Sequence, residues 1–200
     1  MARDRMGVKP MYYAILDDGT LMFGSELKVL MQHPGLDRSM DPLAVEEYFA
    51  LGYVAEPRTI FSGARKLEPG FSLCIRHGQP VPEPKPYWDV RFTLDNKVSL
   101  ADAQAEMVER LRESVRLRMV AEVPLGAFLS GGVDSSAVVA TMAGLSSEPV
   151  NTCSIAFDDP AFNESAFAQM VADRYKTNHR VETVQSDDFD LIDTLGALYD

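Results

Sequence analysis

The sequence predicts an α/β protein whose second half forms a parallel β-sheet with helices on both faces. From residue 124 onward, short apolar runs alternate with amphipathic segments in the order strand, helix, strand, helix, and this order is typical of a parallel sheet. The composition is ordinary for a globular protein, with 46% hydrophobic and 24% charged residues. A length of 200 residues accommodates one large domain or two small ones.

The first half begins with a predicted β-hairpin. Residues 11–16 and 20–24 are rich in strand-forming side chains, and Asp17-Asp18-Gly19 between them has turn chemistry. A short helix is expected over residues 25–31, and the turn residues at 33–35 would end it.

A second helix is expected after Asp41, which would cap it, with Pro42 in the first turn. Residues 56–92 contain six prolines and are predicted to form strands and turns. The proline-rich run at 80–86 must be extended, and we interpret it as a surface loop or edge near a domain boundary. The apolar positions of the second helix are Leu43, Val45, Tyr48 and Phe49.

A long amphipathic helix is predicted to start after Ser99, with the acid Asp102 at the third helical position. Four arginines decorate it, and we interpret them as a solvated face rather than as phosphate ligands. The arginines are Arg110, Arg112, Arg116 and Arg118. The apolar stripe consists of Leu100, Ala103, Met107, Leu111, Val115 and Met119.

The rest of the chain alternates between strand and helix. Gly144 is expected to end the first helix of this region. The expected strands are residues 124–129, 150–157 and 180–184, and the expected helices are residues 135–143, residues 164–175 and one that begins near residue 186.

The loop after the first of these strands carries the chemistry. Residues 130–136 read Ser-Gly-Gly-Val-Asp-Ser-Ser, and ligands bind at the carboxyl ends of parallel strands. Backbone amides exposed by the two glycines, together with a helix N-terminus, form an anion site to which serine hydroxyls add donors. The carboxylate of Asp134 fits such a site if a Mg²⁺ ion lies between it and phosphate. A plain Gly-Gly turn before a serine-capped helix is the alternative.

The loop lacks the Gly-Lys-Ser/Thr of kinase-type phosphate loops, so transfer of a γ-phosphate is not implied. It resembles the PP-loop of the ATP pyrophosphatases, which split ATP between the α and β phosphates and adenylate a substrate. The candidate residues for binding ATP and pyrophosphate are Leu129, Ser130, Gly131, Gly132, Asp134, Ser135, Ser136 and Ile155.

Charge and composition exclude several classes of protein. Residues 1–100 hold 12 basic and 13 acidic side chains, whereas residues 101–200 hold 7 and 17, so the proposed nucleotide-binding half is acidic and a nucleic-acid partner is not expected. No apolar run approaches the length of a membrane span, and no signal peptide is evident. Cys74 and Cys153 lack metal-ligand spacing. We therefore expect a cytoplasmic protein.

Several further motifs resemble the glutamine-hydrolysing asparagine synthetase family. Residues 2–13, 23–28 and 65–70 resemble the closing part of its glutaminase domain. Residues 124–126 and 154–158 resemble the start of its synthetase domain. The resemblance implies two incomplete domains: residues 1–95 would be the closing α+β part of an Ntn-type glutaminase, and residues 96–200 the first part of a synthetase domain with the adenine nucleotide α-hydrolase-like fold.

The resemblance also implies a reaction. Aspartate and Mg·ATP would give β-aspartyl-AMP and pyrophosphate, and ammonia from glutamine would convert the adenylate to asparagine. ATP and Mg²⁺ are the implied cofactors, and Asp134 would act in catalysis by holding the Mg²⁺ of the pyrophosphate. Leu129 and Ile155 match positions whose backbone meets the adenosine; for Ile155, a plain core residue is an equal alternative. The implied partners are small molecules, and a homodimer of the full-length protein is compatible with the family.

The sequence departs from the family at its ends. The family's glutaminase nucleophile is an N-terminal cysteine, whereas this sequence begins Met1-Ala2, so the chain contains no such nucleophile. We expect an internal part of a longer enzyme that is inactive alone.

Two alternatives remain open. The first is a related amidotransferase of exopolysaccharide biosynthesis, a branch that residues 52–60 and 87–90 resemble. The second is a nucleotide-binding fragment without activity. A tRNA-modifying adenylase is disfavoured by the acidic second half.

Overall fold

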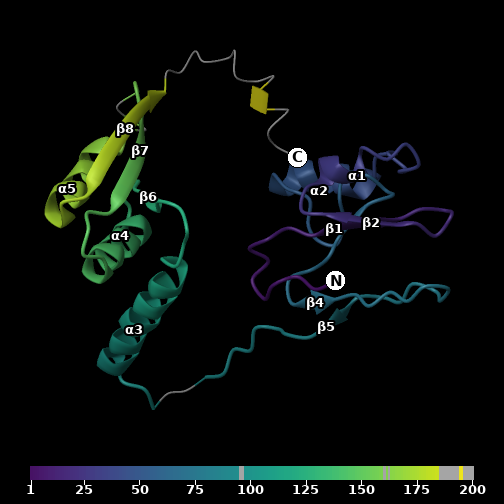
Figure 1. Ribbon diagram of the computed structural model, residues 1–200, viewed down its shortest axis with the longest axis horizontal. Coiled ribbons are helices and arrows are strands. Elements are labelled where there is room, and N and C mark those ends of the chain that lie inside the picture. The colour runs from purple at the N-terminus through teal and green to yellow at the C-terminus, as the bar shows by residue number, and fades with distance from the viewer. Residues whose placement is uncertain (95–96, 160, 162, 185–193, 196–200) are drawn as a thin grey trace. The chain divides into compact units, whose positions relative to one another are not determined.

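The computed structural model describes residues 1–94, 97–159, 161, 163–184 and 194–195 (Figure 1). Contacts divide the chain into two compact units. Unit 1 comprises Met1–Thr93, and unit 2 comprises the described residues of Leu94–Leu195. Each unit is described by itself. The helix expected near residue 186 lies outside the described residues.

Unit 1 contains the predicted hairpin. β1 (Tyr12–Ile15) pairs antiparallel with β2 (Leu21–Gly24) and, on its other side, with β3 (Arg65–Lys66). At the hairpin turn, Gly19 has a φ of 83°, a left-handed conformation that glycine adopts without strain. The turn residues therefore act as the sequence predicted.

Two helices follow the hairpin. α1 (Leu27–Leu30) lies within the predicted range and buries its two terminal leucines in the core of unit 1. α2 (Pro42–Leu51) begins at the predicted proline, and the Asp41 carboxylate accepts a hydrogen bond from the Leu43 amide at 2.9 Å. The start of α2 is confirmed, because capping is a local property, whereas α1 begins two residues later than expected and its N-cap, Glu26, makes no side-chain capping bond.

The predicted apolar face of α2 is not its packed face. Ala44 is the buried residue of the helix, whereas Leu43, Tyr48 and Phe49 are exposed, Phe49 by 83%. Because the Ala44 side chain is small, the backbone of α2 can lie close to the rest of unit 1. The larger apolar side chains consequently face away from the core of unit 1.

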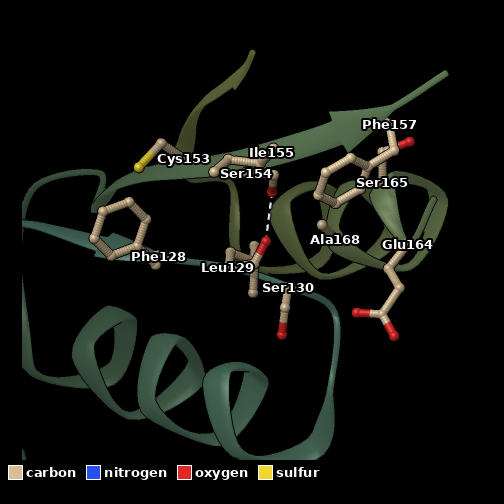
Figure 2. Close-up of a pocket in the computed structure, with 10 residues that line it drawn as sticks. All are labelled: Phe128, Leu129, Ser130, Cys153, Ser154, Ile155, Phe157, Glu164, Ser165 and Ala168. Carbon is tan, nitrogen blue, oxygen red and sulfur yellow. Dashed lines mark hydrogen bonds between the residues drawn. The ribbon is translucent and has the colours of Figure 1, made fainter. Parts of the chain in front are cut away.

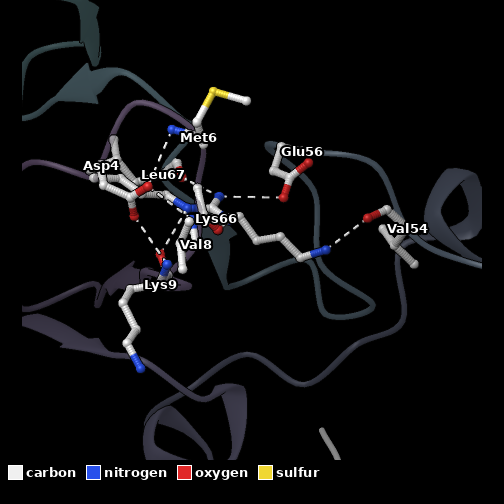
Figure 3. A network of polar contacts seen from close by, with 10 residues as sticks. Asp4, Met6, Val8, Lys9, Val54, Glu56, Lys66 and Leu67 are labelled. Atoms are coloured by element: carbon white, nitrogen blue, oxygen red, sulfur yellow. Dashed lines mark hydrogen bonds and ion pairs between the residues drawn. The ribbon is translucent and has the colours of Figure 1, made fainter. Parts of the chain in front are cut away.

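The proline-rich segment is extended, as predicted. β4 (Phe71–Ser72) pairs antiparallel with β5 (Lys85–Pro86). Near these strands, the N-terminal segment is fixed by a polar network (Figure 3). The Asp4 carboxylate accepts hydrogen bonds from the amides of Met6, Val8 and Lys9 at 2.9–3.2 Å.

Arg3 beside it is a buried arginine. Its guanidinium donates to the carbonyls of Leu67 at 2.8 Å and Lys9 at 3.1 Å, and forms an ion pair with Glu56 at 3.3 Å. The network ties the N-terminal loop to the strand segment that precedes β4. Arg3 therefore holds together parts of unit 1 that lie more than 60 residues apart in sequence, whereas the Asp4 carboxylate shapes the N-terminal loop itself.

Unit 2 starts with α3 (Leu100–Arg118), whose first amides are capped by Ser99 as predicted; the Asp102 amide donates to the Ser99 hydroxyl at 3.1 Å. Only the C-terminal part of the apolar stripe is packed. Val115 is buried in a cluster with Met142 and Val150, whereas Leu100 is 75% exposed. The apolar stripe therefore identified the helix correctly, but it predicted a longer buried face than the helix has.

The arginines of α3 form local ion pairs on its exposed surface. Arg110 pairs with Glu106 at 2.5 Å, and Arg116 pairs with Glu113 at 2.7 Å. These pairs fit the interpretation of a solvated helix face.

The predicted parallel sheet is present. β6 (Gly126–Phe128), β7 (Asn151–Phe157) and β8 (Asn178–Val184) lie in that order, and both neighbouring pairs are parallel. α4 (Val133–Leu145) connects β6 to β7, and α5 (Ser165–Tyr175) connects β7 to β8 (Figure 1). α4 begins two residues earlier than expected and continues through Gly144 to Leu145, so Gly144 does not end it.

Both crossover helices pack on one face of the sheet. Along β7, Thr152, Ser154 and Ala156 are buried, and the alternate residues are exposed. The expectation of helices on both faces is therefore wrong for the described residues. When strands are added in one direction with right-handed crossovers, successive helices fall on the same side. The core beneath them consists of Leu129, Val139, Ala168 and Ala172.

No helix within the described ranges is long and apolar enough to cross a membrane.

Candidate functional site

The predicted anion-binding loop joins β6 to α4. Leu129, which directly follows β6, is 1% exposed, and its amide donates to the Cys153 carbonyl at 2.8 Å. Gly131 follows with a φ of 81°, and Gly132 is the N-cap of α4. The chain therefore leaves a buried strand, turns through a left-handed glycine and enters a helix, as the sequence predicted.

The serines of the loop bond to each other. The hydroxyls of Ser130 and Ser135 lie 3.0 Å apart, and the Ser130 amide donates to the Ser135 hydroxyl at 3.3 Å. The Ser136 amide donates to the Gly132 carbonyl at 3.0 Å. The loop is thus closed on itself at the helix N-terminus, where the first helical amides have no partner within the helix. Such an end attracts anions.

The loop packs tightly against the start of α5. A Cβ built at Gly131 would lie 2.6 Å from both the Phe167 Cβ and the Ala168 amide nitrogen. Only glycine fits this position without displacing the α5 backbone. This close contact places the loop and the start of α5 side by side.

A pocket of about 270 Å³ opens at the carboxyl ends of β6 and β7 (Figure 2). Leu129, Ser130 and Ile155 contribute to its wall together with residues of α5. Ile155 is 53% exposed, so the alternative that it is a plain core residue is wrong. The full lining is Phe128, Leu129, Ser130, Cys153, Ser154, Ile155, Phe157, Glu164, Ser165 and Ala168.

Asp134 lies in the first turn of α4 and is exposed. An exposed carboxylate beside a helix N-terminus fits Mg²⁺, which is commonly bound by one or two carboxylates plus substrate phosphates. No group of three or more metal-ligating side chains occurs within the ranges that the structure describes. Asp134 could hold such an ion only if other groups, such as phosphate oxygens, supplied further ligands.

The structure adds one group of residues that the sequence analysis gave no role. Ser154 and Thr152 are polar side chains buried on the helix-covered face of β7, and the His179 ring of β8 lies within hydrogen-bond distance of both. Ser154 also donates to the Leu129 carbonyl (Figure 2). In the sequence, these residues could have been recognised as small polar side chains at alternate positions of a strand, where buried apolar side chains are usual.

A larger pocket, of about 510 Å³, lies in unit 1 and is lined by Tyr12, Tyr48, Tyr53 and Lys66 among others. The Lys66 ammonium donates to the Val54 carbonyl at 2.7 Å (Figure 3). Its cation is therefore engaged with the backbone, and the loop of unit 2 remains the better candidate site for a phosphate ligand.

Two family models match the chain in succession. The glutamine amidotransferase domain matches residues 1–88, and asparagine synthase matches residues 106–200. These two domains in this order define a glutamine-dependent ligase. The chain belongs to the asparagine synthase (glutamine-hydrolysing) family.

Curated relatives carry the corresponding names. A putative asparagine synthetase [glutamine-hydrolyzing] 2 of Methanocaldococcus jannaschii is 34% identical over 100% of this chain and 39% of its own length. Asparagine synthetase [glutamine-hydrolyzing] 3 of Bacillus subtilis is 34% identical over 83% of this chain and 28% of its own length. A putative asparagine synthetase [glutamine-hydrolyzing] of Mycobacterium bovis is 35% identical over 94% of this chain and 29% of its own length. The chain thus spans 28–39% of the length of these relatives.

Proposed function

We propose that the chain is part of an asparagine synthetase that adenylates aspartate with ATP and amidates the adenylate with ammonia derived from glutamine. The observation that carries the proposal is the loop at residues 130–136, which lies at the carboxyl end of β6 beside a pocket. The family match supports ATP as the nucleotide and glutamine as the nitrogen source. The products would be asparagine, AMP and pyrophosphate.

We assign residues 1–95 to the closing part of an Ntn-type glutaminase domain and residues 96–200 to the first part of a PP-loop synthetase domain. The matched ranges of the two family models support this division. Parallel strands with a glycine-serine loop after the first strand support an adenine nucleotide α-hydrolase-like fold for the second part.

The loop residues would bind the leaving pyrophosphate. The hydroxyls of Ser130 and Ser135 and the amides at the start of α4 would donate to phosphate oxygens, and these bonds would stabilise negative charge as the bond between the α and β phosphates breaks. Asp134 would hold Mg²⁺ on the pyrophosphate; when bound, the ion neutralises charge on the phosphate oxygens. The backbone of Leu129 and Ile155 would contact the adenosine along the pocket wall.

The test uses the full-length protein with ATP, glutamine and aspartate, and it measures AMP, pyrophosphate and asparagine by mass spectrometry. We expect the three products in equal amounts, and we expect ammonia to replace glutamine. Formation of ADP instead of AMP would contradict cleavage between the α and β phosphates.

The identity of the amidated carboxylic acid distinguishes asparagine synthesis from related reactions. A panel of carboxylic acids in the same assay separates asparagine synthesis from a related amidotransferase that acts on another acid. Nucleotide binding without pyrophosphate release for any acid would favour a binding module without activity.

A further inference from the structure

A chain of hydrogen bonds near the loop connects side chains of β7, of β8 and of the residue that precedes β8. The Ser154 hydroxyl lies 3.3 Å from Nε2 of His179, and Nδ1 of His179 lies 2.8 Å from the Thr152 hydroxyl. The Thr152 hydroxyl in turn lies 2.8 Å from the Thr177 hydroxyl. At its other end, the Ser154 hydroxyl bonds to the Leu129 carbonyl.

The direction of these bonds follows from the acceptor at the end. A carbonyl only accepts, so the single Ser154 proton goes to Leu129, and Nε2–H of His179 must donate to the Ser154 oxygen. In the neutral ring Nδ1 then accepts from the Thr152 hydroxyl, which accepts from Thr177. One tautomer, with the proton on Nε2, satisfies every member of the chain.

The chain acts on the first peptide group of the loop. Because a peptide bond is planar, fixing the Leu129 carbonyl also fixes the direction of the Ser130 amide. That amide donates to the Ser135 hydroxyl at 3.3 Å. The Leu129–Ser130 peptide is therefore held by Ser154 on its carbonyl side and by Ser135 on its amide side.

We propose that His179 is a positioning residue for the anion-binding loop: its Nε2–H orients the Ser154 hydroxyl, which fixes the Leu129–Ser130 peptide and thereby the Ser130 end of the phosphate site. The proposal rests on the proposed function, in which this loop binds pyrophosphate. His179 itself touches no substrate. Its contribution reaches the ligand through Ser154 and the backbone.

The test measures the dissociation constant of magnesium pyrophosphate by calorimetry on the full-length protein and its variants. His179→Ala and Ser154→Ala are each expected to weaken binding about tenfold, as the loss of one hydrogen bond that orders the site would. The double variant should bind no more weakly than the weaker single variant, because both changes interrupt one path. Additive losses would contradict a shared path.

Two conservative variants separate positioning from general stability. His179→Gln offers an amide donor near the Nε2 position and should restore most of the affinity, whereas His179→Asn reaches only the Nδ1 position and should not. Equal affinities of the Gln and Asn variants would overturn the proposal, and this comparison remains valid if the alanine variants do not fold. Ring ¹⁵N shifts should also show the proton on Nε2; a proton on Nδ1 would overturn the assigned direction.

Asn178→Ala is the matched control. Asn178 adjoins His179 on β8 but projects from the opposite face, where it donates to the Asn151 side chain at 2.8 Å. Its removal should change the melting temperature without changing pyrophosphate affinity. If the wild-type protein bound neither ATP nor pyrophosphate, the proposed function would fail; if it bound them and the His179 variants bound equally well, only the positioning role would fail.

Discussion

Gly131 and Phe167 are in such close contact that a Cβ at Gly131 would lie 2.6 Å from the Phe167 Cβ. The contact joins the predicted phosphate loop to the first turns of α5. Because Gly131 also has a φ of 81°, both its conformation and its surroundings require glycine.

Gly131→Ala is therefore expected to lower the free energy of unfolding by roughly 2–4 kcal/mol, through backbone strain and overpacking together. Gly144→Ala is the control, since Gly144 is exposed in α4 and an added Cβ there meets nothing within 4 Å. That change should stabilise the protein by about 0.5–1 kcal/mol. Denaturant titration of both variants tests the pair, and similar stabilities of the two would contradict the tight contact.

Asp134→Asn should abolish the acid-dependent release of pyrophosphate while leaving the fold intact. The carboxylate is exposed in the first turn of α4, so its contribution to stability is limited to about 0.3–1 kcal/mol from the helix dipole. The assay follows pyrophosphate at saturating ATP and Mg²⁺. Glu148→Gln removes an exposed carboxylate from the loop after α4 and should retain activity; unchanged turnover in Asp134→Asn would exclude the metal-binding role.

Asp4 should make unit 1 sensitive to acid. Hydrogen bonds from the backbone amides of Lys9, Val8 and Met6, with that of Lys9 the largest contribution, hold the pKa of Asp4 below its ordinary value. A pKa that is lower in the folded state stabilises the fold above the unfolded value of about 3.9, and this stabilisation disappears as the pH falls through the folded pKa.

Asp4→Asn should consequently destabilise the protein at neutral pH, and the difference from wild type should shrink below pH 4 or so as Asp4 becomes protonated. Urea titrations at a series of pH values measure this difference. Asp17→Asn, in the exposed hairpin turn, serves as the comparison. A constant difference across the pH range would show that the carboxylate charge is not responsible.

Arg3→Lys should cost roughly 2–4 kcal/mol of stability, because a lysine cannot reach the several carbonyls that the buried guanidinium satisfies. The Leu67 carbonyl, 2.8 Å from the guanidinium, would lose its partner. Arg5→Lys, two residues away and exposed over the Trp88 ring, should change stability by no more than about 0.5 kcal/mol. Thermal unfolding of the two variants distinguishes a buried network from a general loss of arginine.

Local chemistry explains what could be predicted from the sequence. The caps at Asp41 and Ser99, the turn at Gly19 and the loop geometry at Gly131 each depend on a few adjacent residues, so patterns in the sequence identify them. The parallel order of β6, β7 and β8 follows from the alternation of strands and helices.

What could not be predicted depends on tertiary packing. The apolar stripe of α3 does not reveal that only the region around Val115 is covered, and the apolar residues of α2 do not reveal that Ala44 is the contact. Helices on both sheet faces require a reversal in strand order, which the alternation of strands and helices does not specify and the described sheet does not contain. The bond chain through His179 needs the register of two strands, which no local pattern specifies.

The order of strands in unit 2 also bears on how this part of the chain forms during synthesis. In the described sheet, β6, β7 and β8 are neighbours in the same order in which they are synthesised. Each new strand can dock on one that has already emerged, without waiting for a distant partner. In unit 1, by contrast, β1 meets β3 only after about fifty intervening residues have been translated. The sheet of unit 2 can therefore form one strand at a time during synthesis. In unit 1, one edge of β1 has no pairing strand until β3 has been synthesised.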